Sequence, residues 1–300
     1  MIDLMIYNDE YETAKQCVVA LGCFDGVHRG HQALITRARK VASEKKIPLV
    51  IWALSMKRDN LLISLDEKFS HLERLGADAV ISEDFEKIRY MSCEEFADKL
   101  VSEYRAVYTV CGFNFTFGLN AVGDAEKLCR LMAERGGDGE IVDEVTFENT
   151  TVSSTAIRNA LTAGNPVLAG KLLGRFYEIN GVVEHGQAVG TGLGFPTANL
   201  KIPEGRIIPR LGVYRSFCDI GAQRYPAVTN IGSRPTFNSD SSVITVESFI
   251  LAEVGDIYGK KISIKLADFI RPEKHFENKQ ELIEAINADV AKVKKECGIR

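Results

Sequence analysis

The chain has 300 residues and is 45% hydrophobic, which is enough apolar material for two packed domains. Its formal net charge of −4 gives no general attraction to nucleic acid or to anionic membranes, so we expect neither as a partner. No apolar run has the length of a membrane span and no signal peptide is recognisable, which predicts a cytoplasmic protein.

The seven cysteines are odd in number and include no Cys-x-x-Cys pair. This spacing indicates neither a disulfide framework nor a zinc site. We expect the thiols to pack as small hydrophobic side chains. Nothing in the sequence calls for an obligate protein partner.

The first half of the chain alternates strand-like and helix-like segments. Strands are predicted at residues 18–21, 48–54, 77–81, 107–111 and 140–145, and helices at 32–45, 65–75, 92–104 and 125–135. Ser92 and Glu95 have the spacing of a capping box at the start of the third helix. The alternation is typical of a doubly wound α/β domain with a parallel sheet of about five strands.

A glycine-rich segment joins the first predicted strand to its helix. It reads Gly22-Cys23-Phe24-Asp25-Gly26-Val27-His28-Arg29-Gly30-His31. At such a junction, backbone N–H groups and the helix N-terminus can bind a polyphosphate, and glycines let the backbone come close. Two histidines at a helix start can also be mere surface or capping residues. Three glycines, Asp25 and both histidines in one junction favour the phosphate site.

Two further segments of this half carry candidate ligand residues. In Gly112-Phe113-Asn114-Phe115-Thr116-Phe117-Gly118, the three aromatic residues alternate, so we expect them to share one face while Asn114 points away. On the pattern alone, the aromatic side chains can simply be core and Asn114 can cap a turn. Ser153-Ser154-Thr155-Ala156-Ile157-Arg158 combines helix-capping hydroxyls with an arginine one turn later, and by itself it indicates an ordinary helix cap.

The pattern changes after a helix-like run at 165–173. Short alternating strands follow at 178–183, 212–219, 225–230, 245–251 and 261–269, and the chain closes with an amphipathic helix at 278–296. Short strands divided by Gly/Pro turns predict a small antiparallel β-barrel. We therefore divide the chain into a domain of residues 1–174 and a domain of residues 175–300.

The second domain has its own glycine-rich segment, Gly190-Thr191-Gly192-Leu193-Gly194-Phe195-Pro196-Thr197-Ala198-Asn199-Leu200. Glycines permit close approach of the backbone to a ligand. Thr197 and Asn199 are two apart on an extended segment and so point to one side. The alternative is a structural turn with two solvated polar residues.

Taken together, these motifs resemble the bacterial bifunctional riboflavin kinase/FMN adenylyltransferases, also called FAD synthetases. The segment at 22–31 is similar to the His-x-Gly-His signature of nucleotidylyltransferases, and those at 112–118 and 153–158 are similar to two further motifs of the family. Gly-Phe-Pro-Thr-Ala-Asn-Leu at 194–200 is similar to riboflavin kinases, as are the segments at 230–237 and 246–249.

The resemblance implies phosphorylation of riboflavin to FMN and adenylylation of FMN to FAD, with ATP as co-substrate and Mg²⁺ as cofactor. In the first domain it implies that His28, His31 and Arg158 act on the ATP phosphates. The nucleotide- and flavin-binding residues that it implies there are Gly22, Phe24, Asp25, Gly30, Asn114, Ser153, Ser154 and Thr155. In the second domain, Thr197 and Asn199 would bind Mg²⁺ and phosphates, Glu247 would be the general base, and Gly190, Gly194 and Pro196 would contact the nucleotide.

Two departures from the family keep alternatives open. The family usually follows its second strand with Phe-x-Pro-His-Pro, whereas this chain reads Ala53-Leu54-Ser55-Met56-Lys57. The family mostly has arginine where Thr191 stands. One alternative is a monofunctional riboflavin kinase with a degenerate nucleotide- or flavin-binding first domain. Another is a nucleotidylyltransferase that acts on a different phosphate, which the barrel motifs disfavour.

Overall fold

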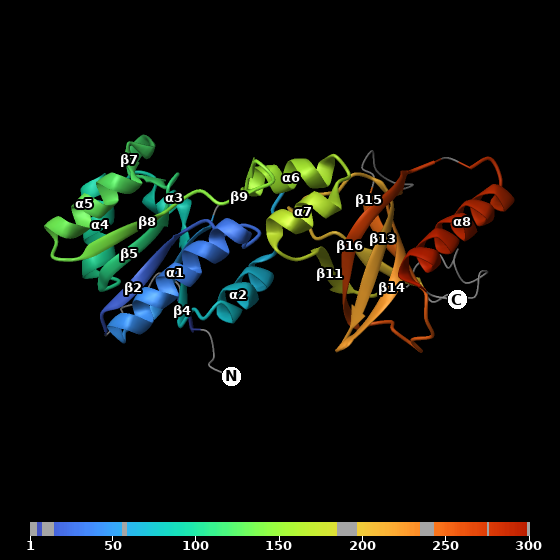
Figure 1. The fold of residues 1–300 in the computed structure, drawn as a ribbon, viewed down its shortest axis with the longest axis horizontal. Coiled ribbons are helices and arrows are strands. Elements are labelled where there is room, and N and C mark those ends of the chain that lie inside the picture. The colour runs from blue at the N-terminus through green and yellow to red at the C-terminus, as the bar shows by residue number, and fades with distance from the viewer. Residues whose placement is uncertain are drawn as a thin grey trace. The chain divides into compact units, whose positions relative to one another are not determined.

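The computed structural model describes residues 5–7, 15–55, 59–184, 197–234, 243–274 and 276–298. Its internal contacts divide the chain into two compact units, Met1–Ser154 and Thr155–Arg300 (Figure 1). Each unit has its own sheet and its own core. Within the described residues, no helix is long and apolar enough to cross a membrane.

The first unit is built on a six-stranded parallel sheet in the order β1-β4-β3-β2-β5-β8. The strands are β1 (Met5–Tyr7), β2 (Cys17–Gly22), β3 (Leu49–Ser55), β4 (Ala79–Asp84), β5 (Ala106–Gly112) and β8 (Asp138–Val142). The predicted doubly wound α/β class is confirmed, and β1 is an edge strand beyond the five that were predicted. From β2 the chain builds the sheet outward to β4 and then returns to β5 on the other side of β2.

Helices cover both faces of this sheet: α1 (Arg29–Lys45), α2 (Leu65–Arg74), α3 (Phe85–Ile88), α4 (Cys93–Ser102) and α5 (Ala125–Glu134). Alternate residues of β2 serve two cores, because Val18 and Ala20 pack with α1 and α2 whereas Val19 and Leu21 pack with α4 and α5. Helix α1 begins before the predicted residue 32, because His28 caps it.

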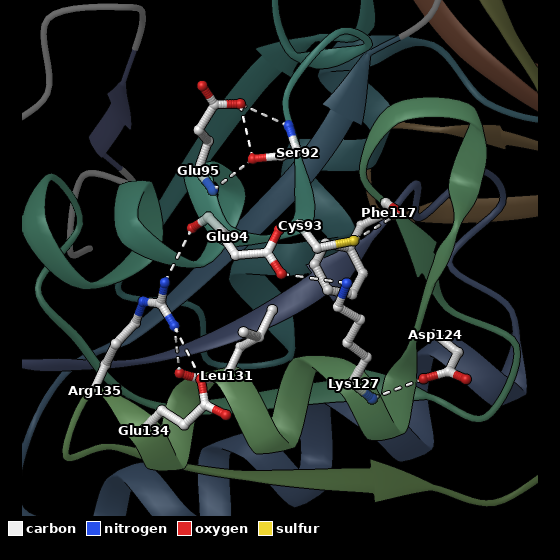
Figure 2. A network of polar contacts seen from close by, with 10 residues as sticks. All are labelled: Ser92, Cys93, Glu94, Glu95, Phe117, Asp124, Lys127, Leu131, Glu134 and Arg135. Atoms are coloured by element: carbon white, nitrogen blue, oxygen red, sulfur yellow. Dashed lines mark hydrogen bonds and ion pairs between the residues drawn. The ribbon is translucent and has the colours of Figure 1, made fainter.

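Polar contacts join α4 to α5, as Figure 2 shows. The predicted capping box is present, since the Glu95 N–H donates to Ser92 Oγ and the Ser92 N–H donates to the Glu95 carboxylate. Lys127 Nζ lies 3.3 Å from Glu94 Oε1, and Arg135 donates to the main-chain oxygen of Glu94 at 3.3 Å. The contacts of Glu94 with Lys127 and Arg135 hold α4 and α5 together on the same face of the sheet.

Two hairpins complete the first unit. One comprises β6 (Thr116–Phe117), the 3-10 helix η1 (Leu119–Ala121) and β7 (Gly123–Asp124), and the other pairs β9 (Thr146–Phe147) with β10 (Thr150–Thr151). The prediction that Phe113, Phe115 and Phe117 share one face is wrong. A turn closed by Phe115 N–H on the Gly112 carbonyl interrupts the alternation, so Phe113 is 48% exposed while the other two pack with Phe96.

The second unit is an antiparallel sheet of six strands in the order β11-β16-β13-β14-β15-β12. The strands are β11 (Tyr177–Val182), β12 (Thr197–Lys201), β13 (Gly212–Ile220), β14 (Gln223–Arg234), β15 (Val243–Ile250) and β16 (Lys261–Pro272). An antiparallel bridge between Glu184 and Asn199 brings the two edges of the sheet together. This agrees with the predicted small barrel, to which β12 is an added strand.

Helices that precede and follow the barrel strands in sequence pack on this barrel. Helix α8 (Lys279–Cys297) covers Val213, Val228 and Phe249 and is held by an ion pair of 2.8 Å between Arg271 and Asp289. Helix α6 (Ser154–Thr162) precedes α7 (Pro166–Leu173), which buries four apolar residues, Pro166, Ala169, Leu172 and Leu173. The Arg210 N–H donates to the Leu161 carbonyl at 3.0 Å, so the end of α6 is hydrogen-bonded to the barrel unit.

Candidate functional site

The first candidate site lies where the strand order of the parallel sheet reverses. Gly22 ends β2 and Gly112 ends β5, and these two strands are neighbours. In open α/β sheets, the crevice beyond the carboxyl ends of two such strands is the preferred place for a ligand. The predicted glycine loop therefore begins at this crevice.

The loop has an unusual backbone. Phe24 and Val27 are both buried and have φ angles of 51° and 40°, a region that residues other than glycine rarely adopt. Such strain persists only where the surroundings hold it. Asp25 supplies part of this hold, because its Oδ1 accepts from the Leu62 N–H at 3.0 Å and its main-chain oxygen accepts from Ser154 Oγ at 2.8 Å.

The two histidines lie against each other at the start of α1. His28 Nδ1 accepts the His31 N–H at 3.3 Å and so caps the helix. The imidazole rings stack with centroids 3.6 Å apart and planes 15° apart, and the Phe24 ring meets His31 edge-on at 5.2 Å. The two imidazole rings thus lie next to each other at the N-terminus of α1.

Gly30 makes room for this stack. A Cβ atom on Gly30 would lie 3.2 Å from Cε1 of His28, which is closer than most real Cβ contacts. A Cβ on Gly22 would likewise lie 3.2 Å from the ring of Phe24. Both glycines therefore serve neighbouring rings, in addition to any approach of a ligand.

The electrostatic surroundings keep His31 neutral. Burial, then the neighbouring His28 and Lys68, hold the pKa of His31 well below its ordinary value. Its buried Nδ1 has no hydrogen-bond partner in the part of the chain that the structure describes. A neutral imidazole can still donate one N–H to an anion.

A small pocket of about 120 Å³ lies beside the loop, between the ends of β2 and β3 and the start of α2. It is lined by Cys23, Asp25, Leu54, Ser55, Leu61, Ile63, Leu65 and Lys68. It borders the segment in which this chain departs from the Phe-x-Pro-His-Pro of the family. Met56, Lys57 and Arg58 of that segment lie outside the described residues.

The other residues predicted for this site lie on three segments. Asn114 is exposed after the end of β5, and its Oδ1 would be 3.4 Å from a Cβ on Gly112. Ser153 precedes α6, and Ser154 is tied to the glycine loop through Asp25. Thr155 and Arg158 follow on α6, in the second unit.

The second candidate site is a row of side chains across the barrel. Asn199 on β12 is the register partner of Glu247 on β15, which is in turn the partner of Asn230 on β14. Register partners in an antiparallel sheet project on the same face, so these three side chains are neighbours. Ala198 and Leu200 alternate with them and are buried on the other face.

Thr197 shares the face of Asn199, and its buried Oγ1 has no hydrogen-bond partner among the described residues. Hydroxyl, amide and carboxylate oxygens are suitable ligands for Mg²⁺, which takes few protein ligands and usually binds substrate phosphates as well. No group of three or more His, Cys, Asp and Glu side chains in the described ranges could hold a metal alone. The side chains of Thr197, Asn199 and Glu247 are thus chemically suited to a Mg²⁺ ion that also binds substrate phosphates.

Several sequence predictions remain without a structural account. Gly190, Thr191, Gly194 and Pro196 lie outside the described residues, as do the last three residues of the segment at 230–237. Conversely, sequence reasoning missed Lys68, a largely buried residue whose Nζ donates to the Cys23 carbonyl at 3.0 Å. Only its position within the apolar stripe of α2, next to Phe69, could have indicated it.

Comparison with known proteins covers both units. A family model described as FAD synthetase matches residues 10–156, and one described as riboflavin kinase matches residues 173–297. A bifunctional riboflavin kinase/FMN adenylyltransferase of Pseudomonas fluorescens is 35% identical over 287 residues, 92% of each chain. That of Listeria monocytogenes is 32% identical over 295 residues, 95% of this chain and 93% of the relative.

A solved structure of similar fold bears a different title. The crystal structure of a macrolide-efflux protein from Streptococcus pneumoniae is 29% identical and has a TM-score of 0.86. The match covers 97% of this chain and 99% of the other.

Proposed function

The chain belongs to the family of bifunctional riboflavin kinases/FMN adenylyltransferases, and we propose that its two units divide the two reactions between them. The barrel unit phosphorylates riboflavin to FMN with ATP. The parallel-sheet unit transfers the adenylyl group of ATP to FMN, which yields FAD and pyrophosphate. The observation that supports this division is that each unit holds its own cluster of polar side chains, His28 with His31 in one and Asn199 with Glu247 in the other.

Phosphoryl transfer needs a base aimed at the acceptor hydroxyl and a means of neutralising the phosphates. We assign Glu247 as the base that takes the proton of the riboflavin 5′-hydroxyl while its oxygen attacks the γ-phosphorus and ADP leaves. Asn230 and Asn199 flank Glu247 in the register and so can orient its carboxylate. Thr197 and Asn199 would hold Mg²⁺, which when bound neutralises charge on the ATP phosphates.

Adenylyl transfer needs no protein base, because the phosphate of FMN is already an anionic nucleophile. One of its oxygens attacks the α-phosphorus of ATP, and the bond to the pyrophosphate breaks. His28 and His31 at the N-terminus of α1 are suited to stabilise the charge that develops on the phosphates. Ser154 and Arg158 are proposed to bind the leaving pyrophosphate, by resemblance to the family motif.

The remaining residues of the first site are proposed to shape it. Gly22 and Gly30 make room for the rings of Phe24 and His28, and Asp25 fixes the loop. Ser153 and Thr155 flank Ser154 at the start of α6. Asn114 and the half-exposed Phe113 follow β5, where an amide and an aromatic face can contact the flavin.

The alternative of a monofunctional kinase is disfavoured. This alternative is based on the missing Pro-His-Pro. However, the FAD synthetase family model matches residues 10–156, and the named relatives, which are bifunctional, match this chain over 92% and 93% of their own length. A nucleotidylyltransferase for a different phosphate is disfavoured by the riboflavin kinase match over residues 173–297.

The experiment that tests the proposal is direct. The purified chain is incubated with riboflavin, ATP and Mg²⁺, and the flavins are separated by chromatography over time. We expect FMN to form first and FAD to follow, and FMN with ATP to release pyrophosphate in proportion to FAD. Formation of FMN without FAD would favour the monofunctional alternative, and absence of both products would overturn the proposal.

A further inference from the structure

Lys68 is a buried cation in a helix that otherwise buries apolar residues. It lies on α2 between the exposed Asp66 and the buried Phe69 and Leu72, and only 9% of its surface is exposed. Removing an ammonium from water is costly unless it is hydrogen-bonded. Its Nζ donates to the Cys23 carbonyl at 3.0 Å, so the side chain is directed at the glycine loop.

This bond fixes one side of a strained residue. The Cys23 carbonyl belongs to the peptide bond that precedes Phe24, whose φ angle is 51°. The other side is fixed by Asp25, whose carboxylate accepts from the Leu62 N–H at 3.0 Å. The segment from Leu62 to Lys68 thus holds the loop immediately before and after Phe24, where an unfavourable backbone conformation needs support.

Phe24 passes this constraint on to the histidines. Its buried ring fills the space above Gly22 and contacts His31 edge-on at 5.2 Å, and His31 stacks on His28 at 3.6 Å. A change in the peptide plane before Phe24 would move its ring and with it the imidazole that it contacts. A displacement of about 1 Å at a reacting centre can cost on the order of 100-fold in rate.

We infer that Lys68 is a positioning residue for adenylyl transfer, which acts by holding the Cys23 carbonyl and thereby the Phe24, His31 and His28 rings. The inference rests on the proposed function. It assigns Lys68 no direct contact with ATP. Its effect should therefore fall on the catalytic step, with the affinity for ATP retained.

The test uses full-length variants and FAD synthesis from FMN and ATP. Lys68→Met keeps the length of the side chain but removes the donor and the charge, whereas Lys68→Arg keeps both. Arg74→Met is the matched control, because it removes a cation from an exposed position of the same helix. Synthesis of FMN from riboflavin by the barrel unit is measured in each sample as an internal reference for intact protein.

We expect Lys68→Met to lower kcat for FAD synthesis on the order of 10- to 100-fold, with little change in KM for ATP and none in FMN synthesis. Lys68→Arg should recover most of the lost rate, and Arg74→Met should match the wild type. If the methionine variant does not fold, Lys68→Leu, which likewise removes the donor and the charge, is measured instead and should also lose kcat.

Three results would overturn the inference while the wild type makes FAD. They are an unchanged kcat in the variants, a loss expressed in KM for ATP with kcat retained, and a loss that Lys68→Arg does not reduce. A wild-type chain that makes no FAD overturns the proposed function, and the inference with it. The failures of the two proposals are thus told apart by the wild-type reaction alone.

Discussion

Asn199 on β12 and Glu247 on β15 are direct partners in the antiparallel register of the barrel. Asn230 lies opposite Glu247 on its other side, so a carboxylate stands between two amide side chains on one face of the sheet. These residues come from three segments of the sequence, and only strand pairing brings them together. The arrangement can orient the carboxylate by amide N–H groups from both sides.

We predict that Glu247→Gln abolishes most FMN synthesis. The amide keeps the size and much of the hydrogen bonding of the carboxylate but is not a useful base, and positioned bases contribute about 10²- to 10⁴-fold. FAD synthesis from supplied FMN should remain nearly unchanged, because it depends on the other unit. The rates of both reactions are measured on the same preparation.

Glu253→Gln is the control for this variant, since Glu253 is an exposed carboxylate that follows β15. It should retain both activities. Loss of both activities in Glu247→Gln would indicate misfolding, and loss of neither would remove Glu247 from the mechanism.

Gly30→Ala should lower FAD synthesis although alanine is the better helix former. The added Cβ would lie 3.2 Å from Cε1 of His28 and displace its ring from the stack on His31. Intrinsic helix propensity favours alanine over glycine by about 1 kcal/mol, so the loss cannot be attributed to a weaker α1. We expect a smaller loss than for His28→Ala, measured as kcat/KM for FMN, with FMN synthesis intact in both. Equal rates for Gly30→Ala and the wild type would contradict the need for this ring position.

The sequence predicted those parts of the fold whose causes are local. Buried strands, amphipathic helices and the capping box at Ser92 and Glu95 are encoded by period and spacing within a few residues. The short edge strand β1 was missed, because three residues carry no period of their own and are held by pairing with β4. The prediction that Phe113 shares a face with Phe115 was wrong, because a turn at Gly112 ends the alternation.

The residues of the candidate sites could be predicted where they lie within a sequence motif, but not where only the fold brings them together. The placement of His28 against His31 agrees with their spacing around Gly30, which the helix start converts into a ring stack. The role of Asn230 beside Glu247 depends on the register of β14 with β15, which neither segment specifies alone. From the sequence alone, Lys68 would be expected to be exposed to solvent. Its burial depends on the tertiary contact of α2 with the glycine loop at Cys23.

Acid should destabilise the first unit through His31. Burial and the nearby His28 and Lys68 hold the pKa of His31 well below its value in the unfolded chain, which is about 6.5. Below that pH the unfolded state binds the proton and the folded state does not. The free energy of unfolding therefore decreases as the pH falls below about 6.5, by at most about 1.4 kcal/mol per pH unit for this group.

The single tryptophan makes this measurable for one unit alone. Trp52 is buried on β3 of the first unit, so its fluorescence reports urea unfolding of that unit. We expect a weaker pH dependence between pH 6.5 and 5 in His31→Gln than in the wild type, and His71→Gln on α2 serves as control. Identical slopes in His31→Gln and the wild type would contradict the neutral state of His31 in the folded protein.

Removal of α6 and α7 should damage the barrel unit, although the strand pattern changes only after them. Helix α7 buries Ala169, Leu172 and Leu173, and the end of α6 accepts a hydrogen bond from Arg210, whose guanidinium lies 4.9 Å from the centre of the Phe269 ring. Burial of a leucine contributes about 1.5–3 kcal/mol, so the two leucines alone account for several kcal/mol. Domains are stable by only about 5–15 kcal/mol, which makes this loss large.

We therefore predict that a fragment of residues 155–300 folds and makes FMN, whereas a fragment of residues 175–300 unfolds at a markedly lower urea concentration and makes little. Neither should make FAD, because His28 and His31 are absent from both. The two fragments are compared by urea unfolding followed by circular dichroism and by FMN synthesis under the same conditions. Equal midpoints would show that α6 and α7 contribute nothing to the barrel and would move the boundary to residue 174. An unfolded fragment 155–300 would show instead that the barrel needs the first unit, because all of its own packing partners on α6, α7 and α8 are then present.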